Sequence, residues 1–233
     1  MNPMPLVLMY HSINYRFDDP YLITVSPARF EEQMQWIRDR GYRGVGMAEL
    51  LEAQSTGSAA NLVALTFDDG YADFLTRAVP VLVRMGFTAS VFMVAGRVGS
   101  TNTWDEGPRK PLMTADQLRT VAGYGMEVGS HGHQHLSLPS VDDGDLDQEL
   151  KRSRAELEEI LDGPVTGFAY PYGDVTPREI DAVKAAGYDY ACAIWGDHAG
   201  PHALPRTYIG EPDRRLRLRA KVVRHRLRWR KHA

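Results

Sequence analysis

Short runs of apolar and β-branched residues recur along the whole chain and alternate with longer amphipathic stretches. This alternation is typical of βα units arranged around a parallel sheet. The apolar runs predict seven strands, at 5–10, 62–67, 88–94, 126–130, 166–170, 188–194 and 204–209. Seven strands with helices between them favour a barrel.

The boundaries of the intervening helices are marked by capping residues. Three predicted N-caps are followed by proline, or by glutamine or glutamate three residues later: Ser26 with Pro27, Thr114 with Gln117, and Thr176 with Glu179. Four glycines stand where helices should end: Gly41, Gly86, Gly125 and Gly187. The acidic stretch 142–159 predicts a solvated helix whose inward stripe consists of Leu146, Leu150, Leu157 and Ile160 or Leu161.

Residues capable of chemistry follow the predicted strand ends. His11 comes after the first strand, Asp68 and Asp69 come after the second, and His131 and His135 come after the fourth. Further candidates follow the fifth and sixth strands: Tyr172, Asp174, Asp197 and His198. In a parallel βα barrel the carboxyl ends of the strands meet on one face, so we expect these residues to share a site there.

The adjacent carboxylates in LTFDDGY, Asp68 and Asp69, can divide the work of a hydrolase. One can bind a cation, while the other stays ionised beside that charge and acts as a base. The simpler interpretation of DDG alone is a turn that caps the next helix. In SHGHQH, His131 and His135 are spaced so that they can share one metal with an aspartate oxygen. Histidine-rich turns also occur without metals, and Gly132 excludes the HExxH pattern of zinc proteases.

Taken together, TFDDGY, EVGSHGHQH and AYPYGD resemble the motifs of the polysaccharide deacetylases of carbohydrate esterase family 4. The resemblance implies a distorted (β/α)7 barrel in a single domain, which we place at residues 1–212. It implies that Asp69, His131 and His135 bind one divalent metal, usually zinc, although cobalt or nickel can use the same ligands. It also implies that Asp68 is the catalytic base and that the backbone N–H of Tyr172 binds the oxyanion.

Two positions depart from the family pattern. Ala169 stands where the family has an arginine, and Thr207 stands where it has a late histidine. We predict that Arg206 orients Asp68 in place of the missing arginine, with a plain surface salt bridge as the alternative. The N-terminal LMYHSI resembles the start of the biofilm poly-N-acetylglucosamine deacetylases, a branch with permuted motif order in which this histidine is the proposed general acid. His11 is therefore the predicted acid, and two rivals stay open: His198 and His202.

Other residues near the motifs have weaker claims to a role. Tyr71, Trp104 and Trp195 can stack on a sugar ring, although single aromatic residues more often pack in a core or at a rim. Asp174 can hold a histidine or bind substrate, but an aspartate after glycine is more often a turn residue. None of the four is assigned.

The predicted function is metal-dependent removal of the N-acetyl group from an N-acetylhexosamine unit of a glycan, glycolipid or sugar conjugate. One alternative is a related metal amidohydrolase that acts on a non-sugar amide or cyclic imide. The other is a catalytically idle barrel that only binds carbohydrate. The intact Asp68 argues against the idle barrel, whereas the missing arginine and late histidine keep it open.

The net charge of -3 hides an asymmetry, because residues 214–233 hold ten of the 27 Lys and Arg residues and no Asp or Glu. Residues 213–233 are predicted to form a basic amphipathic C-terminal helix or tail, with an apolar stripe made of Leu216, Ala220, Val223 and Leu227. Such a helix can lie on an anionic membrane surface. The alternatives are a helix packed on the barrel and a frayed tail. The acidic remainder, without a recognised nucleic-acid module, predicts no specific nucleic-acid partner.

The N-terminal segment MNPMPLVLMYHSI has no basic region, and its apolar run is too short for a signal sequence or a membrane span. We therefore expect a cytoplasmic protein, peripheral at the inner membrane face if the basic helix binds lipid. The single cysteine, Cys192, excludes an internal disulfide. On this basis the expected substrate is a lipid-linked, nucleotide-linked or natural-product-linked amino sugar rather than a finished wall polymer.

Overall fold

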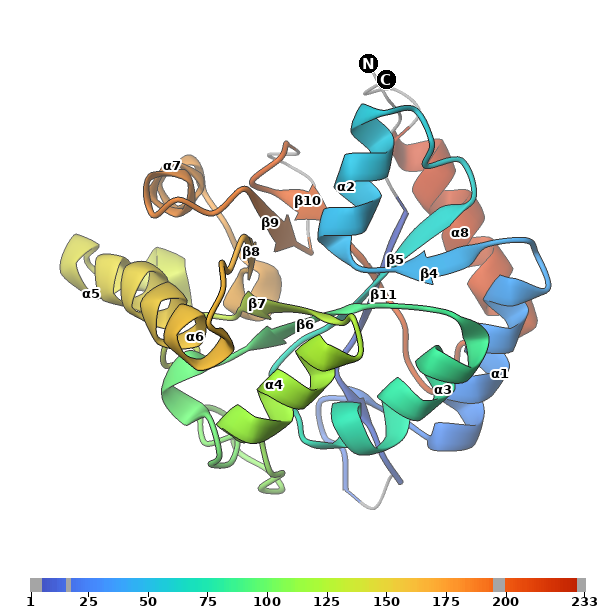
Figure 1. The fold of residues 1–233 in the computed structure, drawn as a ribbon, viewed down its shortest axis with the longest axis horizontal. Coiled ribbons are helices and arrows are strands. Elements are labelled where there is room, and N and C mark those ends of the chain that lie inside the picture. The colour runs from blue at the N-terminus through green and yellow to red at the C-terminus, as the bar shows by residue number, and fades with distance from the viewer. Residues whose placement is uncertain (1–5, 16–17, 195–199, 230–233) are drawn as a thin grey trace.

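Parallel strands lie at the centre of the molecule and helices lie around them (Figure 1). The computed structural model describes residues 6–15, 18–194 and 200–229. The strands are β1 (Val7–Tyr10), β2 (Ser12–Ile13), β3 (Thr24–Val25), β4 (Arg43–Val45), β5 (Leu62–Phe67), β6 (Ser90–Met93), β7 (Glu127–Ser130), β8 (Gly167–Ala169), β9 (Tyr190–Ala193), β10 (Leu204–Pro205) and β11 (Thr207–Tyr208). The α-helices are α1 (Pro27–Arg38), α2 (Met47–Ser55), α3 (Val79–Met85), α4 (Ala115–Gly123), α5 (Asp143–Asp147), α6 (Ser153–Leu161), α7 (Pro177–Ala185) and α8 (Arg215–Trp229).

The main sheet is nearly closed into a barrel by its last segment. Its strands pair in the order β10-β9-β8-β7-β6-β5-β1-β11. β4 pairs with the first residues of β5, along the same edge of β5 that pairs with β6. β10 pairs with β9 and β11 pairs with β1, and only Arg206 separates β10 from β11. The single segment 204–208 therefore bridges the two ends of the sheet. The predicted distorted (β/α)7 barrel in one domain is confirmed.

Each of the seven predicted strand regions contains a strand, although the last one is split in two at Arg206. Three strands were not predicted: β2, β3 and β4. These have only two or three residues each, which is too short for an apolar run to stand out in the sequence.

Alternating side chains along the strands sort the apolar residues into two cores. Val63 and Leu65 of β5 belong to the larger core, between the strands and the surrounding helices. Ala64 of β5 instead belongs with Phe92 of β6 and Tyr190 of β9 to a smaller core inside the barrel, to which α2 also contributes. Cys192 of β9, a free thiol, is buried in the same inner core. The inner core fills the barrel below the ends of the strands that carry the polar motifs.

The predicted helix boundaries are confirmed. The Ser26 side chain caps α1, Thr114 and Gln117 form a reciprocal capping box on α4, and the Glu179 carboxylate accepts from the N–H and hydroxyl of Thr176 before α7. The four predicted stop glycines follow α1, α3, α4 and α7 with left-handed backbone: Gly41, Gly86, Gly125 and Gly187.

The predicted helix over 142–159 is present, and only its burial differs from the expectation. It runs without a break through α5, a π-helical turn at Gln148–Arg152, and α6. The predicted leucines are buried or partly buried, but so is Glu149, whose exposed fraction is 3%. The Glu149 carboxylate accepts hydrogen bonds from the backbone N–H groups of His133 and Gln134. Because buried carboxylates need such partners, this face of the helix packs against the loop that contains His133 and Gln134 and does not face solvent.

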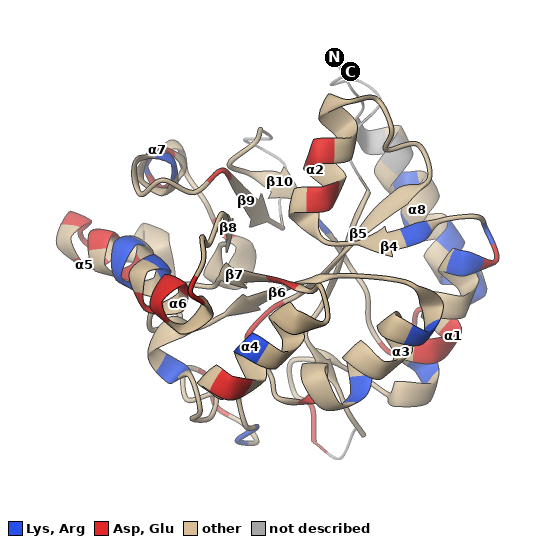
Figure 2. Ribbon diagram, in the orientation of Figure 1, with Lys and Arg blue, Asp and Glu red and all other residues tan. Residues whose placement is uncertain are grey.

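Helix α8 packs beside α1 on one flank of the barrel (Figure 1). Among its described side chains, Leu218, Val222 and His225 are buried. Figure 2 shows that the charged residues along α8 are basic, whereas acidic and basic residues mix on α1, α4, α6 and α7. The division of the chain into a barrel at 1–212 and a basic segment at 213–233 stays a prediction.

Candidate active site

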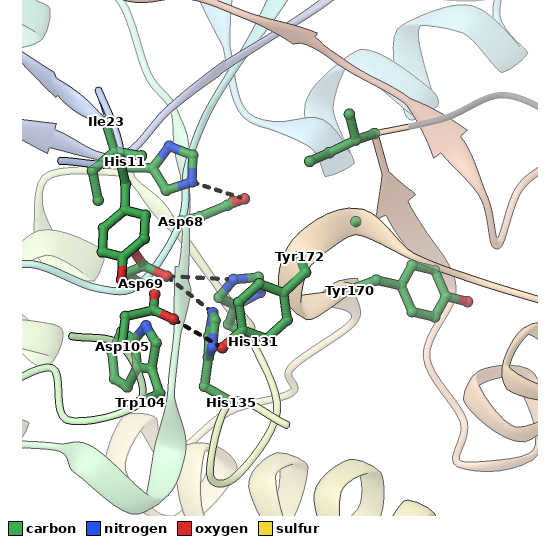
Figure 3. Close-up of a pocket in the computed structure, with 13 residues that line it drawn as sticks. His11, Ile23, Asp68, Asp69, Trp104, Asp105, His131, His135, Tyr170 and Tyr172 are labelled. Atoms are coloured by element: carbon green, nitrogen blue, oxygen red, sulfur yellow. Dashed lines mark hydrogen bonds and ion pairs between the residues drawn. The ribbon is translucent and has the colours of Figure 1, made fainter. Parts of the chain in front are cut away.

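The carboxyl ends of β1, β5, β7 and β8 surround a cavity of about 220 Å³ (Figure 3). The sequence-predicted residues that line it are His11, Asp68, Asp69, His131, His135 and Tyr172. The convergence follows from the parallel sheet, which brings residues after successive strands to one end of the barrel. Residues more than a hundred positions apart in the sequence therefore face one space.

Asp69, His131 and His135 form a compact set of potential metal ligands. Their ligand atoms all lie within 4.8 Å of one another, and all three side chains are buried. Nε2 of His131 is 3.5 Å and Nε2 of His135 is 3.4 Å from the same oxygen, Oδ1 of Asp69. These separations are long for hydrogen bonds, and they suit three ligand atoms that share one cation.

The hydrogen bonding of His131 prepares it to bind a metal. Its Nδ1 lies 2.7 Å from the carbonyl oxygen of Ala169. A carbonyl can only accept, so Nδ1 carries the proton and Nε2 presents its lone pair toward Asp69. Burial lowers the pKa of His131 to about 4, which keeps the imidazole neutral. For Asp69, burial favours the neutral acid, but the interactions with His135 and the other nearby histidines hold its pKa well below the usual range.

His135 is held by aromatic packing instead of a hydrogen bond. Trp104 stacks on its ring at a centroid distance of 4.5 Å and an interplanar angle of 22°. Tyr172 contacts the same ring edge-on at 4.7 Å. The Nδ1 atom of His135 is buried without a hydrogen-bond partner among the described residues. The orientation of the His135 ring therefore depends on Trp104 and Tyr172.

The backbone is strained at three site residues. Five non-glycine residues among those described have positive φ, and Asp69, His135 and Tyr172 are three of them, at 72°, 64° and 60°. Strain of this kind costs on the order of 1–3 kcal/mol per residue and persists where the surrounding structure imposes it. Gly70 follows Asp69 with φ of 71°, and a side chain there would collide with Met93. The tight turn thus explains the glycine after the two aspartates.

Asp68 is held inside the barrel by Arg206. Nη1 of Arg206 donates to Oδ1 of Asp68 at 2.6 Å, and Nη2 donates to Oδ2 at 2.7 Å. The Arg206 side chain is fully buried, and its guanidinium lies 5.8 Å from the Phe92 ring of the inner core. Burial alone would raise the pKa of Asp68, but the Arg206 guanidinium and nearby histidines bring it below its ordinary value. The structure thus places this arginine at Asp68, and the surface salt bridge considered as the alternative does not form.

His11 points toward Asp68 within the pocket (Figure 3). Its Nε2 is 4.0 Å from Oδ2 of Asp68, and its side chain is 16% exposed. Its Nδ1 is buried without a hydrogen-bond partner among the described residues. The rival His202 lies outside the pocket, with Nε2 2.9 Å from the carbonyl oxygen of Tyr188. His198, together with Asp197 and Trp195, lies outside the described residues.

Some site residues escaped the sequence analysis. Asp105 lines the pocket and accepts a hydrogen bond from the Tyr172 hydroxyl at 3.2 Å, but its loop has no periodic pattern to reveal it. Glu149 holds the loop between His131 and His135. Its signal was present in the sequence, three residues after Leu146 on the inward face of the predicted helix. Asp174 is exposed and does not line the pocket.

The chain resembles known proteins over most of its length. Residues 56–191 match the family described as polysaccharide deacetylase. The Bacillus subtilis protein YxkH, a polysaccharide deacetylase by name, is 29% identical over 184 residues, 78% of this chain and 61% of that protein. The poly-β-1,6-N-acetyl-D-glucosamine N-deacetylase of Escherichia coli K12 is 26% identical over 227 residues, 79% of this chain and 33% of that protein.

Among solved structures, the Streptococcus pyogenes deacetylase PplD has the same fold. It matches with a TM-score of 0.81 at 23% identity, over 95% of this chain and 99% of that one. The chain spans less than two thirds of the length of the two relatives matched by sequence.

Proposed function

Because the chain belongs to the polysaccharide deacetylase family, we propose that it hydrolyses the N-acetyl group of an N-acetylhexosamine unit with one bound divalent metal. One observation carries the proposal: Asp68, locked by Arg206, stands beside the ligand set of Asp69, His131 and His135 in a single cavity. A carboxylate base next to a metal site is the arrangement that amide hydrolysis needs.

Asp69, His131 and His135 would hold the metal. Two imidazole nitrogens and one carboxylate oxygen suit zinc, and cobalt or nickel can use the same set. When bound, a divalent ion makes the amide carbonyl more electrophilic and water more acidic. The neutral, buried imidazole of His131 and the ionised carboxylate of Asp69 are the protonation states that such binding requires.

Asp68 and His11 would move the protons. Hydrolysis breaks the C–N bond, gives the water oxygen to the acetyl carbon as acetate, and releases the sugar nitrogen as a free amine. Asp68 takes the proton from water, because its lowered pKa keeps it ionised across the neutral range. His11, 4.0 Å from Asp68, gives a proton to the departing nitrogen. Arg206 does not touch the substrate in this scheme and acts by positioning Asp68.

Tyr172 would contribute through its backbone. The proposal assigns its N–H to the oxygen that becomes negative during attack. The positive φ of 60° turns the peptide at this position, and the ring packs on His135. The Tyr172 ring and Trp104 line the mouth, where aromatic faces suit a sugar ring.

The substrate is proposed to be an N-acetylglucosamine-bearing molecule, since one relative is named for that sugar. A cavity of about 220 Å³ is small for more than one sugar unit. We retain the proposal of a cytoplasmic precursor that is lipid-linked, nucleotide-linked or natural-product-linked. Assays on acetylated sugars and on non-sugar amides would separate a sugar deacetylase from a related amidohydrolase.

The test combines metal analysis with acetate release by wild type, Asp68→Asn and His131→Ala, on N-acetylglucosamine-bearing substrates. We expect about one metal per chain in wild type, retention of metal without turnover in Asp68→Asn, and loss of both in His131→Ala. His11→Ala should lose turnover and keep metal, whereas His202→Ala, outside the pocket, serves as its matched control. If the protein binds metal but releases no acetate from any acetylated sugar, the metal site stands and the proposed substrate class is rejected. Absence of metal would reject the mechanism.

A further inference from the structure

Helix α8 has two apolar faces, and only one of them is needed to pack on the barrel. Leu218, Val222 and His225 are spaced four and three residues apart and are buried. This is the spacing of one face of an α-helix, and it anchors α8 beside α1. Before α8 begins, Gln33 of α1 donates to the carbonyl oxygens of Gly210 and Asp213 and fixes its start. The position of α8 is therefore determined without its second apolar face.

The second apolar face points away from the barrel. We call it the exposed stripe, and it consists of Leu216, Ala220, Val223 and Leu227. The exposed fractions are 81% for Leu216, 47% for Val223 and 59% for Leu227. At roughly 100° per residue, the stripe lies about half a turn around the helix from Leu218 and Val222. A shallow groove on this surface is lined by stripe residues and Arg224.

Arginines flank the exposed stripe on both sides. By the same helical geometry, Arg217 and Arg224 lie along one side, and Arg215 and Arg219 lie along the other. All four are exposed, and none forms an ion pair with a carboxylate of the described residues. Arg214 and Arg215 also line a groove between the start of α8 and α1.

The charges of the whole chain are segregated. All 30 acidic residues and 17 of the 27 basic residues precede position 214, so the body is acidic and the final segment is purely basic (Figure 2). A polyanion that spread over the body would be repelled. A partner that contacts α8 alone and carries negative charge beside an apolar layer would match both features of the helix.

We propose that α8 docks this protein on an anionic lipid bilayer, with the exposed stripe at the boundary between headgroups and acyl chains and the arginines on the phosphates. An apolar stripe between two cationic flanks is the pattern of a helix that lies in the membrane interface. Nucleic acid would use the arginines and leave the leucines in water. No helix among the described residues is long and apolar enough to cross a bilayer, so α8 lies on the surface. The proposal does not depend on the reaction in the pocket.

The test is flotation of the full chain with vesicles of phosphatidylcholine, with and without phosphatidylglycerol. A stripe variant carries Leu216→Gln, Val223→Gln and Leu227→Gln, and a charge variant carries Arg217→Gln, Arg219→Gln and Arg224→Gln. Because all six side chains are exposed, both variants should fold, which circular dichroism checks. Val83→Gln on α3 is the matched control, since Val83 and Val223 are equally exposed at 47%.

We expect wild type and Val83→Gln to float with anionic vesicles and to stay unbound with neutral ones. Each triple variant should bind at least about tenfold more weakly. Raising the salt from about 0.1 M to about 1 M, which shortens the Debye length from about 10 Å to about 3 Å, should release most of the wild type.

Three outcomes would overturn the proposal. The first is that wild type fails to float with anionic vesicles. The second is that it binds DNA in fluorescence anisotropy while the stripe variant binds DNA equally well and no vesicle binding occurs. The third is a dimer in light scattering that the stripe variant abolishes, because a second copy of the chain would then cover the stripe.

Discussion

Arg206 donates a hydrogen bond to each carboxylate oxygen of Asp68 inside the barrel, at 2.6 and 2.7 Å. The two residues are 138 positions apart, and the contact joins the closing segment of the sheet to the turn after β5. Fully buried two-point pairs of this kind hold a carboxylate in one orientation, although they contribute little net stability compared with an apolar pair. The pair is therefore best understood as a device for positioning Asp68.

Replacing Arg206 should impair the reaction without removing the metal. We expect Arg206→Ala to lower kcat by about 100-fold or more, since a misplaced base loses most of its effect. Metal content should stay near that of wild type, because the metal ligands are other residues. Without the guanidinium, burial raises the pKa of Asp68, so the acidic limb of the kcat–pH profile should move to higher pH.

Two further variants sharpen this measurement. Arg206→Lys keeps the charge but loses the two-point geometry, so its kcat should fall between wild type and Arg206→Ala. Arg119→Ala removes an exposed arginine that pairs with Asp116 and should behave as wild type. An unchanged kcat and pH profile in Arg206→Ala would show that Asp68 does not need this partner.

Trp104 should control metal affinity through the ring on which it stacks. Because His135 lacks a hydrogen bond at Nδ1 within the described structure, removing the stacked ring in Trp104→Ala should weaken zinc binding by about tenfold. Trp104→Phe retains a stacking ring and should bind nearly as wild type. Competition with a chromogenic chelator measures the affinity directly. The exposed aromatic Tyr124 offers a control, and equal zinc affinity in Trp104→Ala and Tyr124→Ala would reject the idea.

Glu149 should matter for the folded state as well as for the metal. In Glu149→Ala the backbone N–H groups of His133 and Gln134 lose a buried acceptor, which costs on the order of 2 kcal/mol of unfolding free energy. Because these groups lie between the two histidine ligands, metal affinity should fall too. Urea unfolding of the metal-free protein measures the first effect. Glu159→Ala, an exposed change on α6, is the comparison, and a similar stability in both variants would count against the assignment.

The metal-free protein should lose stability as the pH falls from about 6.5 to about 4. Burial lowers the pKa of His131 from 6.5 to about 4, so within this window the unfolded chain binds a proton that the folded chain does not. The loss should approach about 3 kcal/mol at its limit. Folding lowers the pKa values of Asp68 and Asp69, so their protonation reduces the stability only below about pH 3.8, the pKa of an ordinary aspartate.

Unfolding curves in the presence of a chelator measure this dependence. A His131→Gln variant lacks the titrating group, so its stability should fall less over the same range. If wild type and the variant decline in parallel, the buried imidazole is not the cause.

Much of the fold and the centre of the site could be predicted because the relevant signals are local. The run 62–67 ends in two aspartates and a glycine, and a parallel barrel brings every such strand end to one face. His131 and His135 follow β7 for the same reason. The contact of Arg206 with Asp68 was also predicted, from the missing arginine at Ala169, although its two-point geometry depends on how the last segment closes the sheet, which no local pattern contains.

Other features left weak signals or none. Trp104 and Asp105 lie in a loop without hydrophobic periodicity, so nothing in the sequence ties Trp104 to His135 or Asp105 to Tyr172. Glu149 did carry a signal, since it shares the inward face of its helix with Leu146 and Leu150, but its acidic neighbours suggested a solvated surface. Leu216 and Val223 were identified as part of an apolar stripe, but the sequence left open whether that stripe packs on the barrel, and the structure shows that α8 packs through other residues.

The closure of the barrel at Arg206 also sets the order in which a growing chain can become competent. During synthesis the N-terminal part of a chain is available first. Asp68, Asp69, His131 and His135 are all made well before residue 206, so the guanidinium that holds Asp68 is the last of these groups to be made. The segment that seals the sheet is the one that immobilises Asp68, so the proposed base takes up its fixed orientation only when the fold is complete.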